Sequence, residues 1–312
     1  MHGAHGAIIA FGTEAQLAAT DRSLAQGDVP LNAAQLAGDR AYRLFCRPDL
    51  SSYRSAAHLQ LVARARPALA RATRSWTPTP HGPVATYTLT PTGTPRSHVL
   101  IVHGWTSEAA FMAAFAAPLL QRGCRVVLFD HPAHGRSPQR AASLIDLARA
   151  TRAVAAAHGP FDAALAHSIG CLATLLAHEG GAPLGGSHRF ARLCLIAAPN
   201  RLSDIVARFA VEQRLSAAAH RTFARHVVRV GHRPLETFSS ARLLNAHPVP
   251  TLLVHARDDD RVPFTDAEAI TAACPTTELA AVDGLGHARV LYAPPVVRIV
   301  RSFLTDPTTT RG

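Results

Sequence analysis

Short apolar runs alternate with stretches of helical periodicity from residue 98 onward, and this alternation limits the possible folds more than any other feature. A buried strand followed by a helix, repeated along a chain, predicts βαβ units and a mainly parallel sheet flanked by helices. The chain is therefore expected to be an α/β protein. The predicted strands cover residues 98–103, 125–130, 161–166, 192–197, 249–256 and 277–282.

Helices are expected between these strands. The first is Ser107–Gln121, with Ser107 as its N-cap and Gly123 just past its end, because serine favours helix starts and glycine often follows helix ends. The other predicted helices cover residues 142–157, 169–178 and 295–304.

Two segments depart from the alternation. Residues 1–75 are predicted to form an N-terminal helical extension, and Trp76–Thr90, broken by Pro80-His-Gly-Pro83, is expected to be a hairpin of two further strands. Residues 76–200 and 247–312 then make up the core. Residues 201–246 are predicted to be a helical cap inserted between the sixth and seventh strands, since a strandless stretch of that length is too long for a simple crossover.

The predicted cap carries two side-chain patterns. Its apolar residues recur at spacings suited to helices with one buried face, and they are Ile205, Phe209, Leu215, Phe223 and Val227. Arg221, Arg225 and Arg229 recur every four residues and should form one exposed basic stripe. A solvated face is the favoured interpretation, because most helical charge runs are solvated. The alternative is that the stripe attracts acidic or phosphate-bearing acyl carriers.

Composition excludes several classes of protein. Hydrophobic residues make up 48% of the 312 residues and charged residues 17%, which is typical of a globular protein. No apolar run approaches the roughly 20 residues that cross a bilayer, and the first residues lack the basic region of a signal peptide. The five cysteines show no CxxC or metal-ligand spacing, so we expect a reducing compartment, by default the cytoplasm.

The net charge of +11 suggests nucleic-acid binding at first sight. The basic residues are all arginine, however, and they are dispersed along a chain rich in Ala, Gly and Pro. A nucleic-acid partner would require a concentrated basic patch or a recognisable module, and neither is present. We therefore expect no nucleic-acid partner.

The pentapeptide Ala166–Gly170 follows a predicted strand and opens a predicted helix. A nucleophile elbow lies in such a turn between a strand and a helix. The sharp turn requires small residues two positions before and two positions after the serine, and Ala166 and Gly170 are both small. The helix start would direct N–H groups toward a developing oxyanion. Ser168 is thus a candidate nucleophile, although a Ser-x-Gly triplet at a helix start is often only a cap.

A serine nucleophile needs a base and a group that orients the base. His287 follows the last predicted strand in a glycine-rich loop, and the pKa of histidine suits a general base near neutrality. The predicted strand over residues 249–256 is followed by three adjacent carboxylates, those of residues 258–260, of which one could orient His287. The residues alone leave the choice among these three open, and a solvated acidic turn is the alternative.

From about Trp76 to its end, the chain resembles the α/β-hydrolase superfamily of serine esterases and lipases. Five motifs carry the resemblance, in the order that this fold uses. They are His103-Gly104-Trp105, Asp130–Ser137 (Asp-x-x-Ala-x-Gly-x-Ser), the elbow Ala166–Gly170, the acid loop His255–Pro263 and the closing Gly286-His287. The usual glycine at the first elbow position is Ala166 here, and the N-terminal extension lies outside the resemblance.

The resemblance implies a catalytic triad of Ser168, Asp259 and His287. The family's catalytic aspartate stands four residues before the proline of the acid loop, and that spacing selects Asp259; the runner-up is Asp204, where some members place their acid. The resemblance also implies an oxyanion hole made by the backbone N–H groups of Trp105 and Ile169. The substrate-pocket candidates are His103, Gly104, Trp105 and His167. No cofactor or metal is implied, including at His131, His134 or His167.

The expected activity is hydrolysis of carboxylic esters, with a small-molecule ester or thioester as substrate. A thioesterase, an amidase, a C–C bond hydrolase or an acyltransferase could use the same triad. A non-catalytic binding protein that keeps the fold is the alternative from another class, because fold alone does not establish function.

Overall fold

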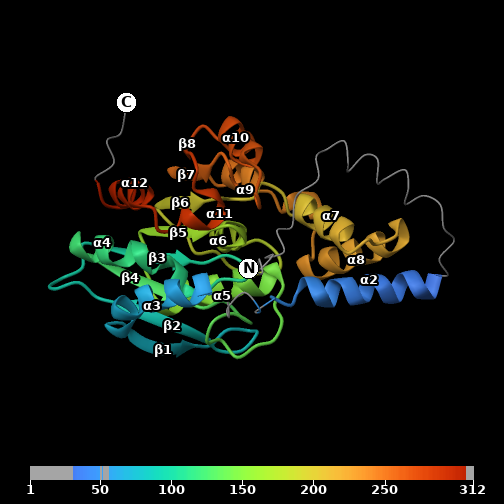
Figure 1. Cartoon of the computed structure of the whole chain (residues 1–312), viewed down its shortest axis with the longest axis horizontal. Coiled ribbons are helices and arrows are strands. Elements are labelled where there is room, and N and C mark those ends of the chain that lie inside the picture. Colours follow the sequence, from blue (N-terminus) through green and yellow to red (C-terminus); the bar gives the residue numbers. More distant parts are fainter. Residues whose placement is uncertain (1–30, 50, 52–55, 307–312) are drawn as a thin grey trace, which may run out of the picture.

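The computed structural model describes residues 31–49, 51 and 56–306, so the first thirty residues of the predicted N-terminal extension lie outside the described part. The described residues contain an eight-stranded sheet in the order β1-β2-β4-β3-β5-β6-β7-β8 (Figure 1). Strand β2 pairs antiparallel with β1 and β4, and the six strands β3 to β8 are parallel to one another. The mainly parallel sheet flanked by helices is thus confirmed. The strands are β1 Thr73–Thr77, β2 Val84–Leu89, β3 Ser97–Val102, β4 Cys124–Phe129, β5 Ala163–His167, β6 Arg192–Ile196, β7 Thr251–Ala256 and β8 Thr277–Val282.

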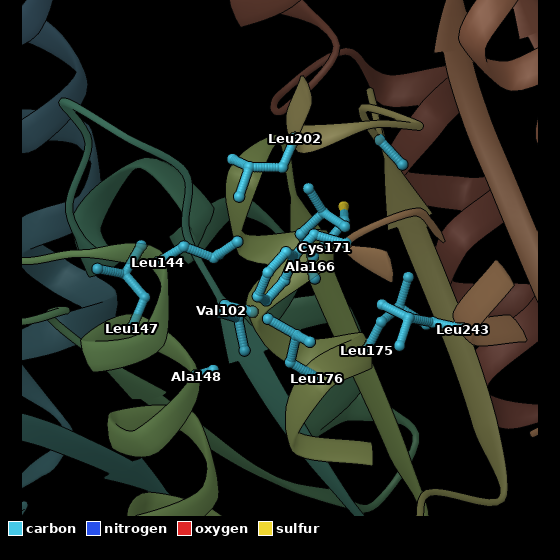
Figure 2. Close-up of a cluster of buried hydrophobic side chains, with 14 of the residues drawn as sticks. Val102, Leu144, Leu147, Ala148, Ala166, Cys171, Leu175, Leu176, Leu202 and Leu243 are labelled. Atoms are coloured by element: carbon cyan, nitrogen blue, oxygen red, sulfur yellow. The ribbon is translucent and has the colours of Figure 1, made fainter. Parts of the chain in front are cut away.

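Helices cover both faces of the sheet, because each strand sends alternate residues to opposite faces. Leu100 and Val102 of β3 belong to the buried cluster that includes residues of α5 (Leu144–His158) and α6 (Ile169–Glu179). Val99 and Ile101 belong to the cluster with η2 (Ala109–Phe115), α4 (Ala116–Gln121) and α12 (Pro294–Thr305). Figure 2 shows side chains of α5 and α6 meeting the sheet residues Val102 and Ala166.

Local signals in the sequence explain where the two central helices begin and end. Ser143 and Asp146 form a capping box at the start of α5, in which the Ser143 N–H donates to the Asp146 carboxylate at 2.9 Å. Gly180 ends α6 in the left-handed conformation. The predicted helices over 142–157 and 169–178 are confirmed to within two residues.

The first predicted helix, Ser107–Gln121, needs correction. The helical segment begins at Ala109 rather than at Ser107, and its first seven residues are the 3-10 helix η2, followed by α4. The side chain that takes the first helical N–H is not a local one, because the Ala109 N–H donates to the carboxylate of Asp130 at 2.8 Å. A hydrogen bond to the first helical N–H from a distant loop cannot be predicted from the local sequence.

The cap contains α7 (Leu202–Glu212), α8 (Ala217–Gly231) and η3 (Leu235–Thr237), and it projects to the right in Figure 1. Its two ends lie side by side: Arg201 bridges Ser239, and the Ser240 N–H donates to the Asn200 carbonyl at 2.7 Å. Helix α9 (Ser240–Ala246), which the sequence assigned to the cap, instead packs against α6 and α10 (Phe264–Ala273) in the core. Leu243 of α9 is buried near Leu175 of α6 (Figure 2), and the division of the chain into core and cap stays a prediction.

The described part of the N-terminal extension contains two helices with different neighbours. Helix α2 (Leu31–Phe45) runs along α8 of the cap, whereas α3 (Ala56–Ala70) packs against η2 of the core (Figure 1). On α2, Tyr42 stacks on His226 at a ring distance of 5.2 Å, and Asp39 pairs with the same histidine. The predicted extension to residue 75 is wrong at its end, because β1 already begins at Thr73.

The cap surface agrees with the predicted stripe. Arg221, Arg225 and Arg229 are all exposed on α8, while Phe223 and Val227 are buried. Attraction of acidic carriers by this stripe stays a prediction.

Among the described residues, no helix has the length and apolar character to cross a membrane.

Candidate active site

Ser168 stands on the turn between β5 and α6, at the carboxyl edge of the parallel strands. Its backbone adopts φ 54° and ψ −131°, which is a strained conformation for a residue with a side chain. The Ser168 N–H donates to the Ile196 carbonyl of β6 at 2.9 Å, which ties the turn to the neighbouring strand. The strained turn lifts the hydroxyl out of the sheet edge, and Ser168 is half-buried rather than covered.

His287 reaches the serine from the loop after β8. It lies on the short helix α11 (Gly286–Arg289), and its Nε2 is 3.1 Å from the Ser168 Oγ. Its side chain is 18% exposed, so the ring is not closed off from solvent. The two side chains are 119 positions apart in sequence and are brought together by the sheet.

Asp259 completes a chain of three side chains. Its Oδ2 lies 2.8 Å from the His287 Nδ1, and its side chain is completely buried. The same carboxylate accepts the N–H groups of Arg261 at 2.8 Å and Val262 at 2.9 Å. Burial raises the pKa of Asp259, but the hydrogen bond and charge of His287, with those two N–H groups, lower it below its ordinary value overall. Asp259 is therefore ionised near neutral pH and holds Nδ1–H of His287.

The other candidate acids do not reach the histidine. The carboxylate of Asp258 accepts the Leu285 N–H at 3.2 Å, and Asp260 is exposed. Asp204 lies in the first turn of α7, where it is exposed and accepts a hydrogen bond from the Ser203 hydroxyl. The structure thus brings together the three residues that the resemblance selected.

His255 is a neighbour of the acid that sequence reasoning missed. Its Nε2–H donates to the Val262 carbonyl at 2.9 Å, and the same nitrogen lies 3.6 Å from the Asp259 Oδ2. The side chain is fully buried, and burial lowers its pKa, so it is neutral and ties the two ends of the acid loop together. In the sequence, only its position four residues before Asp259 pointed to a contact with the acid.

Two glycines allow the loop after β3 to lie directly against the elbow. A Cβ at Gly104 would come within 2.9 Å of the Ser168 Cβ, and one at Gly170 within 2.4 Å of the His103 carbonyl oxygen. Any side chain at either position would force the loop and the elbow apart. Gly104 therefore lies directly against Ser168, and the His103 backbone lies directly against Gly170.

The two predicted oxyanion donors lie on the two sides of this contact. Ile169 is the first residue of α6, and Trp105 follows Gly104 in the loop. No backbone acceptor in the described part of the chain takes either N–H. Their role as oxyanion donors stays a prediction.

Three of the four pocket candidates are buried. His103 is completely buried, and both of its nitrogens are used: Nδ1–H donates to the Gly104 carbonyl at 2.7 Å, and Nε2 accepts the His131 N–H at 2.9 Å. Both ring nitrogens therefore hold backbone groups of the two neighbouring loops, and a place for His103 in a substrate pocket stays a prediction. Gly104 and His167 are also buried, so Trp105, which is half-buried, is the one candidate of the four with substantial exposure.

His167 lies between the elbow and the base. Its ring centroid is 4.7 Å from that of His287, and its Nε2–H donates to the His287 carbonyl at 3.2 Å. Burial, and then the neighbouring His287, lower the pKa of His167 well below its ordinary value. A neutral His167 adds no positive charge beside the base.

Within the described residues, no group of three or more His, Cys, Asp or Glu side chains is arranged to hold a metal ion.

Comparisons with known proteins agree with the fold. Residues 99–299 match the alpha/beta hydrolase family. The esterase domain of a Rhodothermus marinus protein is 19% identical, with a TM-score of 0.52 over 75% of this chain and 96% of that chain. A Pyrococcus furiosus esterase is 18% identical, with a TM-score of 0.56 over 77% and 94% of the two chains. A Bacillus anthracis bromoperoxidase is 15% identical, with a TM-score of 0.55 over 75% and 100%. At these identities the likeness to solved structures establishes the fold alone.

Proposed function

Because this chain belongs to the alpha/beta hydrolase family, we propose that it is a serine hydrolase that cleaves carboxylic esters through an acyl-enzyme on Ser168. One observation carries the proposal: His287 Nε2 lies 3.1 Å from Ser168 Oγ while its Nδ1 lies 2.8 Å from Asp259 Oδ2. Such a chain of nucleophile, base and orienting acid is the arrangement that activates a serine hydroxyl.

The proposed reaction has two steps. The Ser168 Oγ attacks the ester carbonyl while His287 Nε2 accepts the hydroxyl proton, and the imidazolium then donates that proton to the leaving alcohol. Water, deprotonated by the same nitrogen, next attacks the acyl-enzyme; as the bond to Ser168 Oγ breaks and the carboxylic acid leaves, the imidazolium returns the proton to Oγ. Asp259 holds Nδ1–H throughout and stabilises the imidazolium by its charge.

The N–H groups of Trp105 and Ile169 are proposed to bind the oxyanion of each tetrahedral intermediate. The close contact of Gly104 with Ser168 supports this role for Trp105, and the helix start after Ser168 supports it for Ile169. Donors fixed before the reaction stabilise developing charge without reorganisation, and loss of one such donor costs about 10²–10³-fold in kcat.

The site residues of the proposal are thus Ser168, Asp259 and His287, with Trp105 and Ile169 as oxyanion donors. A small-molecule ester or thioester is the proposed substrate, with no cofactor, no metal and no nucleic-acid partner. A cytoplasmic location follows only from the cysteine pattern and belongs to the proposal.

A panel of p-nitrophenyl esters of increasing acyl length, assayed beside an acyl thioester and an anilide, tests the reaction class. We expect turnover of at least one ester that exceeds turnover of the anilide of the same acyl group. Faster thioester cleavage would assign the same site to a thioesterase. Absence of turnover on every ester and thioester would contradict the proposal and favour the non-catalytic alternative.

A further inference from the structure

The loop after β3 contains a strained residue next to the proposed oxyanion donor. Thr106 has φ 47°, a left-handed conformation that a β-branched residue adopts only when its surroundings enforce it. Its N–H donates to the Nε2 of His134 at 3.2 Å. Since Thr106 directly follows Trp105, a group that holds the Thr106 N–H also restricts the orientation of the Trp105 peptide.

His134 is well fixed for this contact. It is 1% exposed, and its Nδ1–H donates to the Pro132 carbonyl at 2.9 Å, which leaves Nε2 unprotonated and able to accept. The Trp105 indole packs edge-on against the ring at 4.8 Å. Burial, and then the neighbouring His103, lower the pKa of His134 to about 3, so the ring stays neutral over the working range of a hydrolase.

The loop that carries His134 is itself held rigidly. Asp130 accepts the N–H groups of Ala109 at 2.8 Å and Arg136 at 2.9 Å and the Tyr87 hydroxyl at 2.8 Å. Asp130 and His134 thus join the loop after β4 to the loop after β3 at two points, Ala109 and Thr106. The segment that contains Trp105 lies between the Gly104 contact with Ser168 and these two hydrogen bonds.

From this geometry we infer that His134 is a positioning residue: its Nε2 fixes the Thr106 peptide and thereby holds the Trp105 N–H beside Ser168. The inference rests on the proposed function, because it assigns a purpose to one of the proposed oxyanion donors. His134 touches neither the serine nor the substrate in this account, and it acts through Trp105.

His131 provides a matched control in the same loop. It is completely buried, and its ring packs against those of His103 at 4.6 Å and Phe129 at 4.8 Å. Neither ring nitrogen has a hydrogen-bond partner among the described residues. The side chain of His131 therefore supplies packing without a hydrogen bond, and phenylalanine should replace it with little effect on catalysis.

The experiment compares His134→Phe and His134→Leu, which remove the acceptor, with His134→Gln, which keeps one, and with His131→Phe. The probe is an alkyl fluorophosphonate, because its reaction with Ser168 passes through an oxyanion and requires no known substrate. The readouts are the maximal labelling rate, the half-saturating probe concentration and the thermal midpoint; on any ester that is turned over, they are kcat and KM.

We expect the Phe and Leu variants to lose about 10- to 100-fold in maximal rate, somewhat less than deletion of a whole oxyanion donor. The half-saturating concentration should change by less than about threefold, because the oxyanion forms only in the transition state. His134→Gln should recover most of the rate, and His131→Phe should keep it. Should the Phe variant fail to fold, the Leu and Gln pair gives the same comparison.

Three results would overturn the inference: a rate for the Phe or Leu variants equal to that of His131→Phe, a loss confined to the half-saturating concentration, or a Gln variant as slow as Leu. Failure of the proposed function is distinguishable from these results. It appears as labelling of the parent protein that persists in Ser168→Ala, or as no labelling of the parent at all.

Discussion

Three adjacent carboxylates follow β7, and the contacts of each decide its role. Asp259 is buried against His287, Asp258 faces the Leu285 N–H, and Asp260 is exposed. The motif spacing selects the same residue as the contacts do, because the acid loop has a fixed length up to Pro263. The Arg261 and Val262 N–H groups both donate to the Asp259 carboxylate, and this turn fixes the spacing between Asp259 and Pro263.

Asp259→Asn should reduce kcat far more than the same change at 258 or 260. The amide that this substitution introduces cannot stabilise the imidazolium, and it favours the wrong tautomer of His287, so a loss of about 10²–10⁴-fold is expected. Asp258→Asn and Asp260→Asn should stay within about tenfold, in line with weaker indirect effects. Steady-state kinetics on one ester measure all of them. Equal losses at 258, 259 and 260, or a larger loss in Asp204→Asn, would contradict the assignment.

The contacts of His134 and His255 could not be predicted from the sequence. Each accepts or donates a hydrogen bond across a loop whose course is set by the fold, to Thr106 in one case and to Val262 in the other. The proposed triad differs, because its members sit at element ends that a family motif marks. Residue-level prediction therefore located the proposed reacting groups and missed the groups that hold them.

At the scale of elements, the five strands from β3 to β7 were predictable because both of their faces are covered by helices, whereas the edge strand β8 is only partly buried. A strand buried on both faces has a continuous apolar sequence, such as Val99-Leu100-Ile101-Val102. Helices with local caps, such as α5, were equally predictable. The 3-10 helix η2 was not, since its first N–H is taken by Asp130 from another loop.

The helices that pack together in the cap region come from distant parts of the chain. Phe45 of α2 meets Phe209 of α7 at 5.1 Å and Phe223 of α8 at 5.2 Å, so the described N-terminal helix and the cap share one aromatic cluster. Helical periodicity predicts the individual helices. It contains no information on partners more than 150 positions away, so the association of α2 with the cap appears only in the folded chain.

Buried neutral histidines link the stability of the whole molecule to pH. Burial lowers the pKa to about 4 in His103 and His178 and to about 3 in His134, and it lowers the pKa of His131 and His167 well below the ordinary value. An unfolded chain protonates these groups near pH 6.5, whereas the folded protein does not. Their contribution to stability is therefore present above pH 6.5 and is lost as the pH falls toward the folded-state values.

The free energy of unfolding should accordingly fall between pH 7 and pH 5, by up to about 1.4 kcal/mol per pH unit for each such histidine. Glu108 opposes this, because burial raises its pKa to about 7, and burial also raises the pKa of Asp130 and Asp266. Urea unfolding at several pH values measures the slope, and His131→Phe should reduce it by nearly one proton. Stability that is constant or rises from pH 7 to pH 5 would show that the buried histidines do not control it.

The central claim is that Ser168 is the nucleophile of the site assembled by the whole fold. The most direct measurement is intact-mass and peptide mapping after reaction with a fluorophosphonate, on the parent protein and on Ser168→Ala. The account predicts one phosphonyl group per chain, on the peptide that contains Ser168, and none in the variant. An unlabelled parent, or a label that persists in Ser168→Ala, would contradict it.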